Sequence, residues 1–177
     1  MNTTQRFGLF AATSAAALCL ALAPLSAQPA QDLPNFHPVG PGIYRGAAPT
    51  EDGLKRLKSM GIHTIIDLRI APKTVKKEKA YAQSLGFQFI NLPMGGDPPT
   101  QKEVNTLLAT LKKAPSEPVF VHCQHGADRT GCMIGIYRVT QQGWQWNNTF
   151  AEMRKYGFNP HWTKLSGAVK ERIGKPG

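Results

Sequence analysis

The chain has 177 residues, a length that, once an N-terminal leader is set aside, fits a single domain with one sheet and several helices. Its 21 Lys and Arg residues against 11 Asp and Glu residues give a formal net charge of +10, which suits phosphorylated or other anionic partners. The same charge would suit nucleic acid, but the chain has no recognised nucleic-acid motif and no interleaving of basic with aromatic residues. We therefore expect no nucleic-acid partner.

Residues 1–27 have the pattern of a secretory signal peptide. Arg6 is the only charged residue among them, the following run is apolar and rich in alanine, and Ala27 is a small residue suited to cleavage before Gln28. The apolar run is too short and wrongly flanked for a stable membrane span. The sequence thus predicts export to the periplasm and a single mature domain over residues 28–177, with no stable membrane insertion after cleavage.

The first part of the mature chain is predicted to be mostly extended. Residues 28–42 contain four prolines and are expected to form an extended N-terminal arm, followed by a short strand at residues 43–46. Thr50 is predicted to cap a helix over residues 51–59.

The next strand is predicted at residues 62–68, with Arg69 directly at its carboxyl end. In open α/β sheets, ligands bind beyond the carboxyl ends of the strands. Arg69 is therefore a candidate for the wall of a binding site. A salt bridge from Arg69 to Asp67 or Glu78 explains its position equally well.

A Lys-rich helix at residues 74–84 and a strand at residues 87–92 lead into a loop over residues 93–99. Thr100 and Glu103 then have the spacing of a capping box, and the helix behind them carries apolar residues at helical spacing. These apolar positions are Val104, Leu107, Leu108 and Leu111.

Two further helices are predicted near the C-terminus, at residues 147–156 and at residues 160–173. Six bulky side chains of this part are expected to pack in the core or between helices: Trp144, Trp146, Phe150, Met153, Phe158 and Trp162. The alternation of strands and helices predicts an α/β domain with a small, mostly parallel sheet and helices on both faces.

The most informative stretch lies between a buried strand predicted at residues 119–121 and a helix predicted at residues 133–139. A tight loop that leaves a strand and opens a helix is an anion site, because its amides point inward and the helix N-terminus adds positive partial charge. Cys123 at the end of the strand faces those amides, which would lower the pKa of its thiol. Arg129 offers a planar fork of donors that matches two phosphate oxygens.

Three other residues of this loop have expected roles. Gly126 lets the backbone turn close to the anion, Thr130 can donate its hydroxyl to the thiolate, and His122 can hydrogen-bond the loop backbone. Together with Cys123 and Arg129 they suit in-line attack on phosphorus through a cysteinyl-phosphate intermediate. We expect no metal and no cofactor, because Arg129 and the amides neutralise the developing charge.

The run His-Cys-Gln-His-Gly-Ala-Asp-Arg-Thr-Gly at residues 122–131 resembles the signature of the cysteine-dependent protein tyrosine phosphatases. The dual-specificity branch is the nearest match, and with the leader the chain is similar to the small periplasmic phosphatases of that branch in Gram-negative bacteria. The phrases at residues 44–49 and 67–69 add looser matches. The resemblance implies that the substrate phosphate is bound by the signature loop, residues His122, Gln124, His125, Gly126, Ala127, Asp128 and Arg129.

The resemblance also implies a general acid, an Asp on a mobile loop upstream of the nucleophile. Asp97 is the single acidic residue between Lys79 and Lys102, and it follows two glycines and precedes two prolines. One carboxyl can protonate the leaving oxygen and then activate water. Asp97 is therefore the predicted acid, since Glu103 is already used by the capping box.

The function predicted from the sequence is a phosphatase of phosphotyrosine, with phosphoserine and phosphothreonine as secondary substrates. The expected partner is a phosphorylated protein, and the expected state is a monomer. A phosphatase of phosphoinositides or inositol phosphates is the alternative, because some lipid-directed relatives also carry an acid at the position of Asp128. A non-catalytic phosphate-binding module is a third reading, which the presence of Cys123, Arg129 and Asp97 disfavours.

Signal cleavage would remove Cys19 and leave Cys123 and Cys132. An exported compartment favours disulfides, whereas a nucleophile must stay reduced. Cys132 is expected to pack on the inner face of its helix, and a regulatory bridge between Cys123 and Cys132 stays open as an alternative.

Overall fold

The computed structural model describes Met1 and residues 29–175. The predicted signal peptide and its cleavage before Gln28 lie outside the described residues. No helix in the part of the chain that is described is both long and apolar enough to cross a membrane.

A five-stranded sheet forms the centre of the domain, with the strand order β1-β2-β5-β3-β4. Four strands run parallel, and β1 at the edge is antiparallel to β2. The strands are β1 (His37–Gly40), β2 (Ile43–Gly46), β3 (Thr64–Asp67), β4 (Gln88–Asn91) and β5 (Val119–His122). The prediction of a small, mostly parallel sheet is confirmed.

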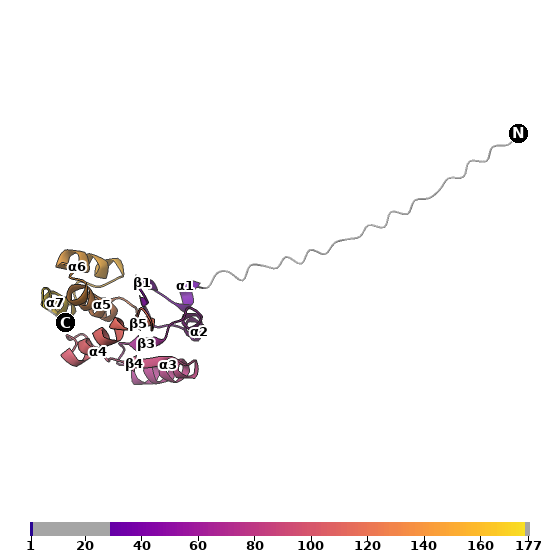
Figure 1. Ribbon diagram of the computed structural model, residues 1–177, viewed down its shortest axis with the longest axis horizontal. Helices are drawn as coiled ribbons and strands as arrows, with labels where there is room; N and C mark the ends of the chain where they lie inside the picture. Colours follow the sequence, from indigo (N-terminus) through magenta and orange to yellow (C-terminus); the bar gives the residue numbers. More distant parts are fainter. Residues whose placement is uncertain (2–28, 176–177) are drawn as a thin grey trace.

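Helices cover both faces of this sheet (Figure 1), as predicted. Ile65 and Phe120 point to the face covered by α1 (Pro29–Asp32), α2 (Glu51–Ser59) and α3 (Pro72–Ser84). Their chain neighbours Ile66 and Val121 point to the other face, because side chains alternate along a strand. That face carries α4 (Gln101–Lys112), α5 (Asp128–Gln141), α6 (Trp146–Lys155) and α7 (Thr163–Lys170).

Local sequence signals set several helix starts. The Thr50 hydroxyl accepts a hydrogen bond from the Gly53 amide at 3.0 Å, and the capping box of Thr100 and Glu103 is present at the start of α4. The four apolar positions predicted for α4 are all buried. These local predictions are confirmed because the interactions involved join residues only a few positions apart.

Two segments differ from the sequence-based expectation. Residues 28–42 were expected to form an extended arm, but the described part of this segment contains the helix α1 as well as the edge strand β1, and it buries Leu33 and Val39. Pro38 is tolerated there because an edge strand does not need every amide for pairing. The last helix, predicted from residue 160, begins at Thr163 instead.

Candidate active site

The signature loop connects the central strand β5 to α5, which begins at Asp128. All four residues of β5 are buried between its parallel neighbours β2 and β3, so the strand delivers Cys123 to the carboxyl edge of the sheet. The loop turns at Gly126, whose φ is +68°. A Cβ atom at Gly126 would lie 2.4 Å from the carbonyl carbon of Gly46, so both conformation and space require glycine there.

Cys123 is a free, buried thiol at the floor of this loop. Burial alone raises the pKa of the Cys123 thiol, but the hydroxyl and amide of Thr130, the charge of Arg129 and the amide of His125 together lower that pKa below its ordinary value. The Thr130 hydroxyl is completely buried and makes no hydrogen bond of ordinary geometry within the described residues, which leaves the sulfur as its polar neighbour. The loop therefore favours a thiolate, as the sequence predicts.

A pocket of about 530 Å³ opens above the loop. Gln124, His125, Asp128 and Arg129 line it from the signature loop and the start of α5. The Arg129 guanidinium is partly buried, and its Nη1 lies 3.4 Å from the Met94 carbonyl oxygen. The structure thus brings four of the seven residues predicted to bind the phosphate to the wall of one pocket, whereas His122, Gly126 and Ala127 do not line it.

The rest of the pocket wall is mainly apolar. It is formed by Ile70, Ala71, Met94, Trp162 and Leu165, of which Ile70 and Trp162 are exposed large side chains. The interpretation of Trp162 as a core residue was wrong, because its side chain is 43% exposed and lines this pocket. Its ring packs directly on Gly96, where an added Cβ would lie 2.5 Å from the ring.

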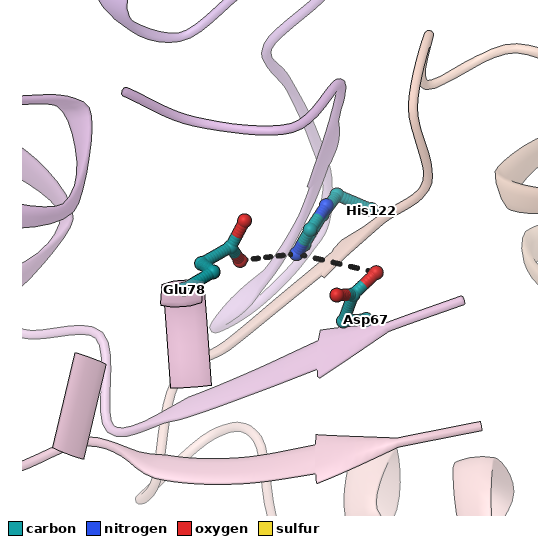
Figure 2. Close-up of side chains that lie close together, drawn as sticks. All are labelled: Asp67, Glu78 and His122. Carbon is teal, nitrogen blue, oxygen red and sulfur yellow. Dashed lines mark ion pairs between the residues drawn. The ribbon is translucent and has the colours of Figure 1, made fainter. Parts of the chain in front are cut away.

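Arg69 combines both roles considered for it. Its guanidinium lies 2.8 Å from Asp67 Oδ2 and 2.5 Å from Glu78 Oε2, and the same side chain lines the pocket. Glu78 also reaches His122, with Oε1 2.9 Å from Nε2 (Figure 2). The strand end, the helix α3 and the signature loop are therefore joined by one buried charged cluster, which consists of Asp67, Arg69, Glu78 and His122 and is called the buried cluster below.

His122 has an acceptor on each ring nitrogen, because Nδ1 lies 3.2 Å from the Cys123 carbonyl oxygen while Nε2 faces Glu78. Burial lowers the pKa of His122, but the contact with Glu78 and the charges of Glu78 and Asp67 raise it, and the net change is upward. The imidazolium form donates from Nδ1 to the Cys123 carbonyl oxygen and forms an ion pair with Glu78 at Nε2, which balances the charges of the cluster. The expected contact of His122 with the loop backbone is thus found, at the Cys123 carbonyl.

Sequence reasoning missed Glu78 as the partner of His122. The available signal was that Glu78 is the single acidic residue in a helix rich in lysine. Among the described residues, Asp67, Glu78 and His122 form a group whose ligand atoms lie within 4.8 Å of one another, close enough for a metal ion. The Arg69 guanidinium already holds both carboxylates of this group, so the cluster carries its own cation.

Asp97 lies beside the pocket rather than in its wall. Its neighbours Gly95 and Gly96 line the pocket, whereas Asp97 itself lies in an adjoining hollow with Trp162 and Lys164. The carboxylate is exposed and pairs with the Lys164 ammonium at 2.7 Å. Its assignment as the general acid stays a prediction.

Asp128 lines the pocket and also binds the backbone of a later segment. Its Oδ1 accepts a hydrogen bond from the Asn159 amide at 2.8 Å, which anchors the segment between α6 and α7. Asp128 also lies in the first turn of α5, where a negative charge is stabilised by the helix N-terminus.

The second cysteine is buried in α5, as predicted. Cys132 Sγ donates to the Leu165 carbonyl oxygen at 3.4 Å, and burial raises the pKa of its thiol to about 12. Cys123 and Cys132, the two cysteines among the described residues, are both free. A thiol with so high a pKa is a poor nucleophile for disulfide exchange at neutral pH.

Comparison with known proteins agrees with this geometry. A family model described as a DSP-PTPase phosphatase fused to NAD+ kinase matches residues 29–171. The chain is 29% identical over 125 residues to the dual specificity protein phosphatase TpbA of Pseudomonas aeruginosa, which covers 70% of this chain and 55% of TpbA. It is 30% identical over 126 residues to the inositol diphosphatase DSP3 of Arabidopsis thaliana, which covers 68% of this chain and 61% of DSP3.

The chain thus spans 55% and 61% of the lengths of these two curated relatives. The crystal structure of TpbA from P. aeruginosa superimposes with a TM-score of 0.66 at 26% identity, covering 77% of this chain and 84% of that one. The sequence match, the fold and the signature loop agree with one another. The chain belongs to the dual-specificity branch of the cysteine-dependent protein tyrosine phosphatase family.

Proposed function

We propose that the protein is a phosphatase that uses Cys123 as its nucleophile and prefers phosphotyrosine. The lowered pKa of the Cys123 thiol supplies a thiolate beneath the loop. The thiolate attacks phosphorus, the bond to the leaving oxygen breaks, and Asp97 gives that oxygen a proton. Water activated by the same carboxylate then hydrolyses the cysteinyl-phosphate, while Arg129 and the loop amides stabilise the charge on the phosphoryl oxygens.

The observation that carries the preference for phosphotyrosine is the apolar rim of the pocket. Ile70 and Trp162 are exposed beside a loop that fits one phosphate, and an aromatic ring gains free energy by packing on such side chains. The charged residues of the pocket wall are two arginines and one aspartate, and the Arg69 guanidinium is already held by Asp67 and Glu78. This lining supports one phosphate with an apolar leaving group.

An inositol diphosphatase is the second candidate. The identity to DSP3 is 30% and the identity to TpbA is 29% over alignments of nearly equal length, and the net charge of +10 suits a polyanion. A ligand with many phosphates requires several cationic side chains around its ring, however, and the wall described above has few. The preference for phosphotyrosine therefore rests on the pocket wall and not on the comparison.

The test is turnover of a phosphotyrosyl peptide against a phosphoseryl peptide and an inositol diphosphate, measured as phosphate release with the same enzyme preparation. We expect the highest kcat/KM for the phosphotyrosyl peptide. A higher value for the inositol diphosphate would replace this function with the second candidate. No turnover of any of the three would contradict the enzymatic proposal as a whole.

We further propose that the protein works in the periplasm, which rests on the leader pattern of residues 1–27. Fractionation of cells expressing the full chain, followed by N-terminal sequencing, tests this. A periplasmic product that begins at Gln28 is expected, and a cytoplasmic product that retains Met1 would contradict export.

A further inference from the structure

Arg45, on β2, lies completely buried behind the signature loop. Its side chain is 1% exposed, its Nη2 donates to the Gly126 carbonyl oxygen at 2.8 Å, and its guanidinium lies 4.7 Å from the centre of the Tyr156 ring. Its Nε and Nη1 have no hydrogen-bond partner within residues 29–175. Burying a guanidinium with two unused nitrogens costs free energy, so its placement against the loop calls for an explanation other than stability.

Three successive carbonyls of the loop accept hydrogen bonds from one segment of the chain. The Gln124 oxygen accepts from the Ala48 amide at 3.3 Å, the His125 oxygen accepts from Asn35 Nδ2 at 3.2 Å, and the Gly126 oxygen accepts from Arg45. All three donors come from the segment between residues 35 and 48, which includes β1 and β2. The segment around β1 and β2 thus supplies hydrogen-bond donors to the loop.

The direction of these carbonyls fixes the direction of the loop amides. In a planar trans peptide the C=O and the N–H point to opposite sides. Peptides whose oxygens are bound from behind therefore turn their N–H groups, those of His125, Gly126 and Ala127, toward the opposite side. Of the three donors only Arg45 is charged, and a charged donor polarises the peptide that it binds more strongly than a neutral one.

We propose that Arg45 is a positioning residue for the phosphate-binding loop, whose guanidinium orients and polarises the Gly126–Ala127 peptide so that the Ala127 amide faces the bound oxyanion. The proposal rests on the proposed function, because it assumes that the loop binds a phosphoryl group. It assigns to β2 a part in anion binding that the signature motif does not contain. It also explains why the cation lies behind the loop instead of in the pocket.

The charges around Arg45 agree with this role. Burial lowers the pKa of Arg45 to about 10, which still leaves it charged at neutral pH. The groups that act on it are Glu152, Tyr156 and Cys123, which raise its pKa, and Arg138, which lowers it. The nearby His37 has a lowered pKa, through burial first and then through Arg45 and Lys155, so it adds no competing charge at neutral pH. The attraction to the Cys123 thiolate is one of the contributions that raise the pKa of Arg45.

Two variants of Arg45 and one control separate positioning from stability. Arg45→Met keeps the length of the side chain without its charge or donors, and Arg45→Lys keeps the charge without the planar fork. Leu57→Ala creates a cavity on the α2 side of the sheet and serves as the control, because Leu57 is fully buried there, in the core cluster away from the signature loop. Three quantities are measured for wild type and for each variant. They are the thermal midpoint of unfolding, the pKa of the Cys123 thiol from the pH dependence of its alkylation by iodoacetamide, and the affinity for tungstate by calorimetry.

We expect Arg45→Met to raise the pKa of the Cys123 thiol and to weaken tungstate binding about tenfold, less than the ~10²–10³-fold loss in rate on removing a direct oxyanion donor. Arg45→Lys should also raise the pKa of the Cys123 thiol and weaken tungstate binding, each by a smaller amount than Arg45→Met. Leu57→Ala should lower the thermal midpoint and leave the thiol pKa and the tungstate affinity unchanged. If Arg45→Met lowers the thermal midpoint as Leu57→Ala does, while the thiol pKa and the tungstate affinity stay at wild-type values, Arg45 is only structural and the proposal is overturned.

Should Arg45→Met fail to fold, Arg45→Lys decides, since wild-type values of both quantities in that variant would overturn the proposal. Neither measurement needs turnover. Failure of the proposed function can therefore be distinguished from failure of the Arg45 proposal. The first would appear as wild-type protein that hydrolyses none of the test substrates, whatever thiol pKa and tungstate affinity the Arg45 variants show.

Discussion

The Glu78 carboxylate on α3 meets the His122 imidazole at the end of β5, with 2.9 Å between Oε1 and Nε2. The other ring nitrogen of His122 faces the Cys123 carbonyl oxygen, so the ring lies between the helix and the nucleophile's own backbone. Two carboxylates, from Asp67 and Glu78, and two cations, from Arg69 and protonated His122, balance within the buried cluster. Removal of the Glu78 carboxylate from α3 is therefore expected to change the position of His122 and of the signature loop.

The first prediction concerns the pH dependence of stability. The folded pKa of His122 is raised above its unfolded value, so the folded state binds this proton more tightly. Its contribution to the free energy of unfolding is complete below the unfolded pKa of about 6.5 and is lost as the pH rises through the folded pKa. Glu78→Gln should remove much of this contribution, because breaking a buried ion pair costs about 3–5 kcal/mol.

Urea unfolding of wild type and Glu78→Gln at about pH 6 and about pH 9 checks this. The stability difference between the two proteins should be larger at the lower pH. Glu51→Gln is the control, since its pair with Lys77 is exposed and is expected to contribute little. An equal stability difference between wild type and Glu78→Gln at both pH values would show that the protonation of His122 does not depend on Glu78.

The second prediction concerns the nucleophile and its clamp. Cys123→Ser and Arg129→Ala should each abolish turnover of an aryl phosphate, because a serine hydroxyl is hardly ionised and the bidentate clamp is lost. Cys123→Ser should still bind tungstate, since the loop amides remain. Cys132→Ala is the matched control and should keep turnover, because that thiol is buried in α5 against the Leu165 carbonyl oxygen and its raised pKa keeps it protonated. Turnover should also persist in excess chelator, and a strict metal requirement would contradict the mechanism.

The third prediction concerns the general acid. Asp97→Asn should lower kcat on a phosphotyrosyl peptide by roughly 10²–10⁴-fold, with a smaller loss on a nitrophenyl ester, whose leaving group hardly needs a proton. It should also erase the limb of the pH–rate profile on which activity falls as the acid ionises. Lys164→Met removes the partner of Asp97 and should keep most of the activity. Retention of that limb and of most of the rate in Asp97→Asn would exclude Asp97 as the acid.

The fourth prediction concerns the aromatic wall. Trp162→Ala should lower kcat/KM for a phosphotyrosyl peptide by a factor of roughly 2–10, corresponding to about 0.5–1.5 kcal/mol for an aromatic contact. Tungstate affinity should not change, because the loop is left intact. Trp144→Ala is the control, since that ring packs on Arg138 instead. An equal loss for peptide and tungstate would mean that Trp162 supports the loop rather than the substrate ring.

The fifth prediction concerns Thr130, whose buried hydroxyl has the Cys123 sulfur as its polar neighbour. Thr130→Ala should slow breakdown of the phosphoenzyme more than its formation, because the departing thiolate loses a stabilising contact. Rapid quench should then trap more phosphoenzyme than in wild type. Thr130→Ser keeps the hydroxyl and should behave like wild type, and an unchanged phosphoenzyme level in Thr130→Ala would leave Thr130 a structural role only.

The elements that position the site could be predicted wherever the responsible interactions are local. The strand, the turn at Gly126 and the start of a helix follow one another within the signature run, so the placement of Cys123 beneath an anion loop follows from residues that are neighbours in the chain. The caps of α2 and α4 are local for the same reason. The sequence by itself thus determined the class of fold and the placement of Cys123 between the central strand and the helix that follows it.

The tertiary structure decided what surrounds that loop. Three contacts around the site join segments that are distant in the chain. They are the ion pair of Glu78 with His122, the hydrogen bond from Arg45 to Gly126 and the packing of Trp162 on Gly96. Hydrophobic periodicity predicts which face of an element is buried but not which neighbour it meets. That choice depends on the strand order β1-β2-β5-β3-β4 and on how the helices pack across it, because only this arrangement places β2 behind the loop and α3 beside it.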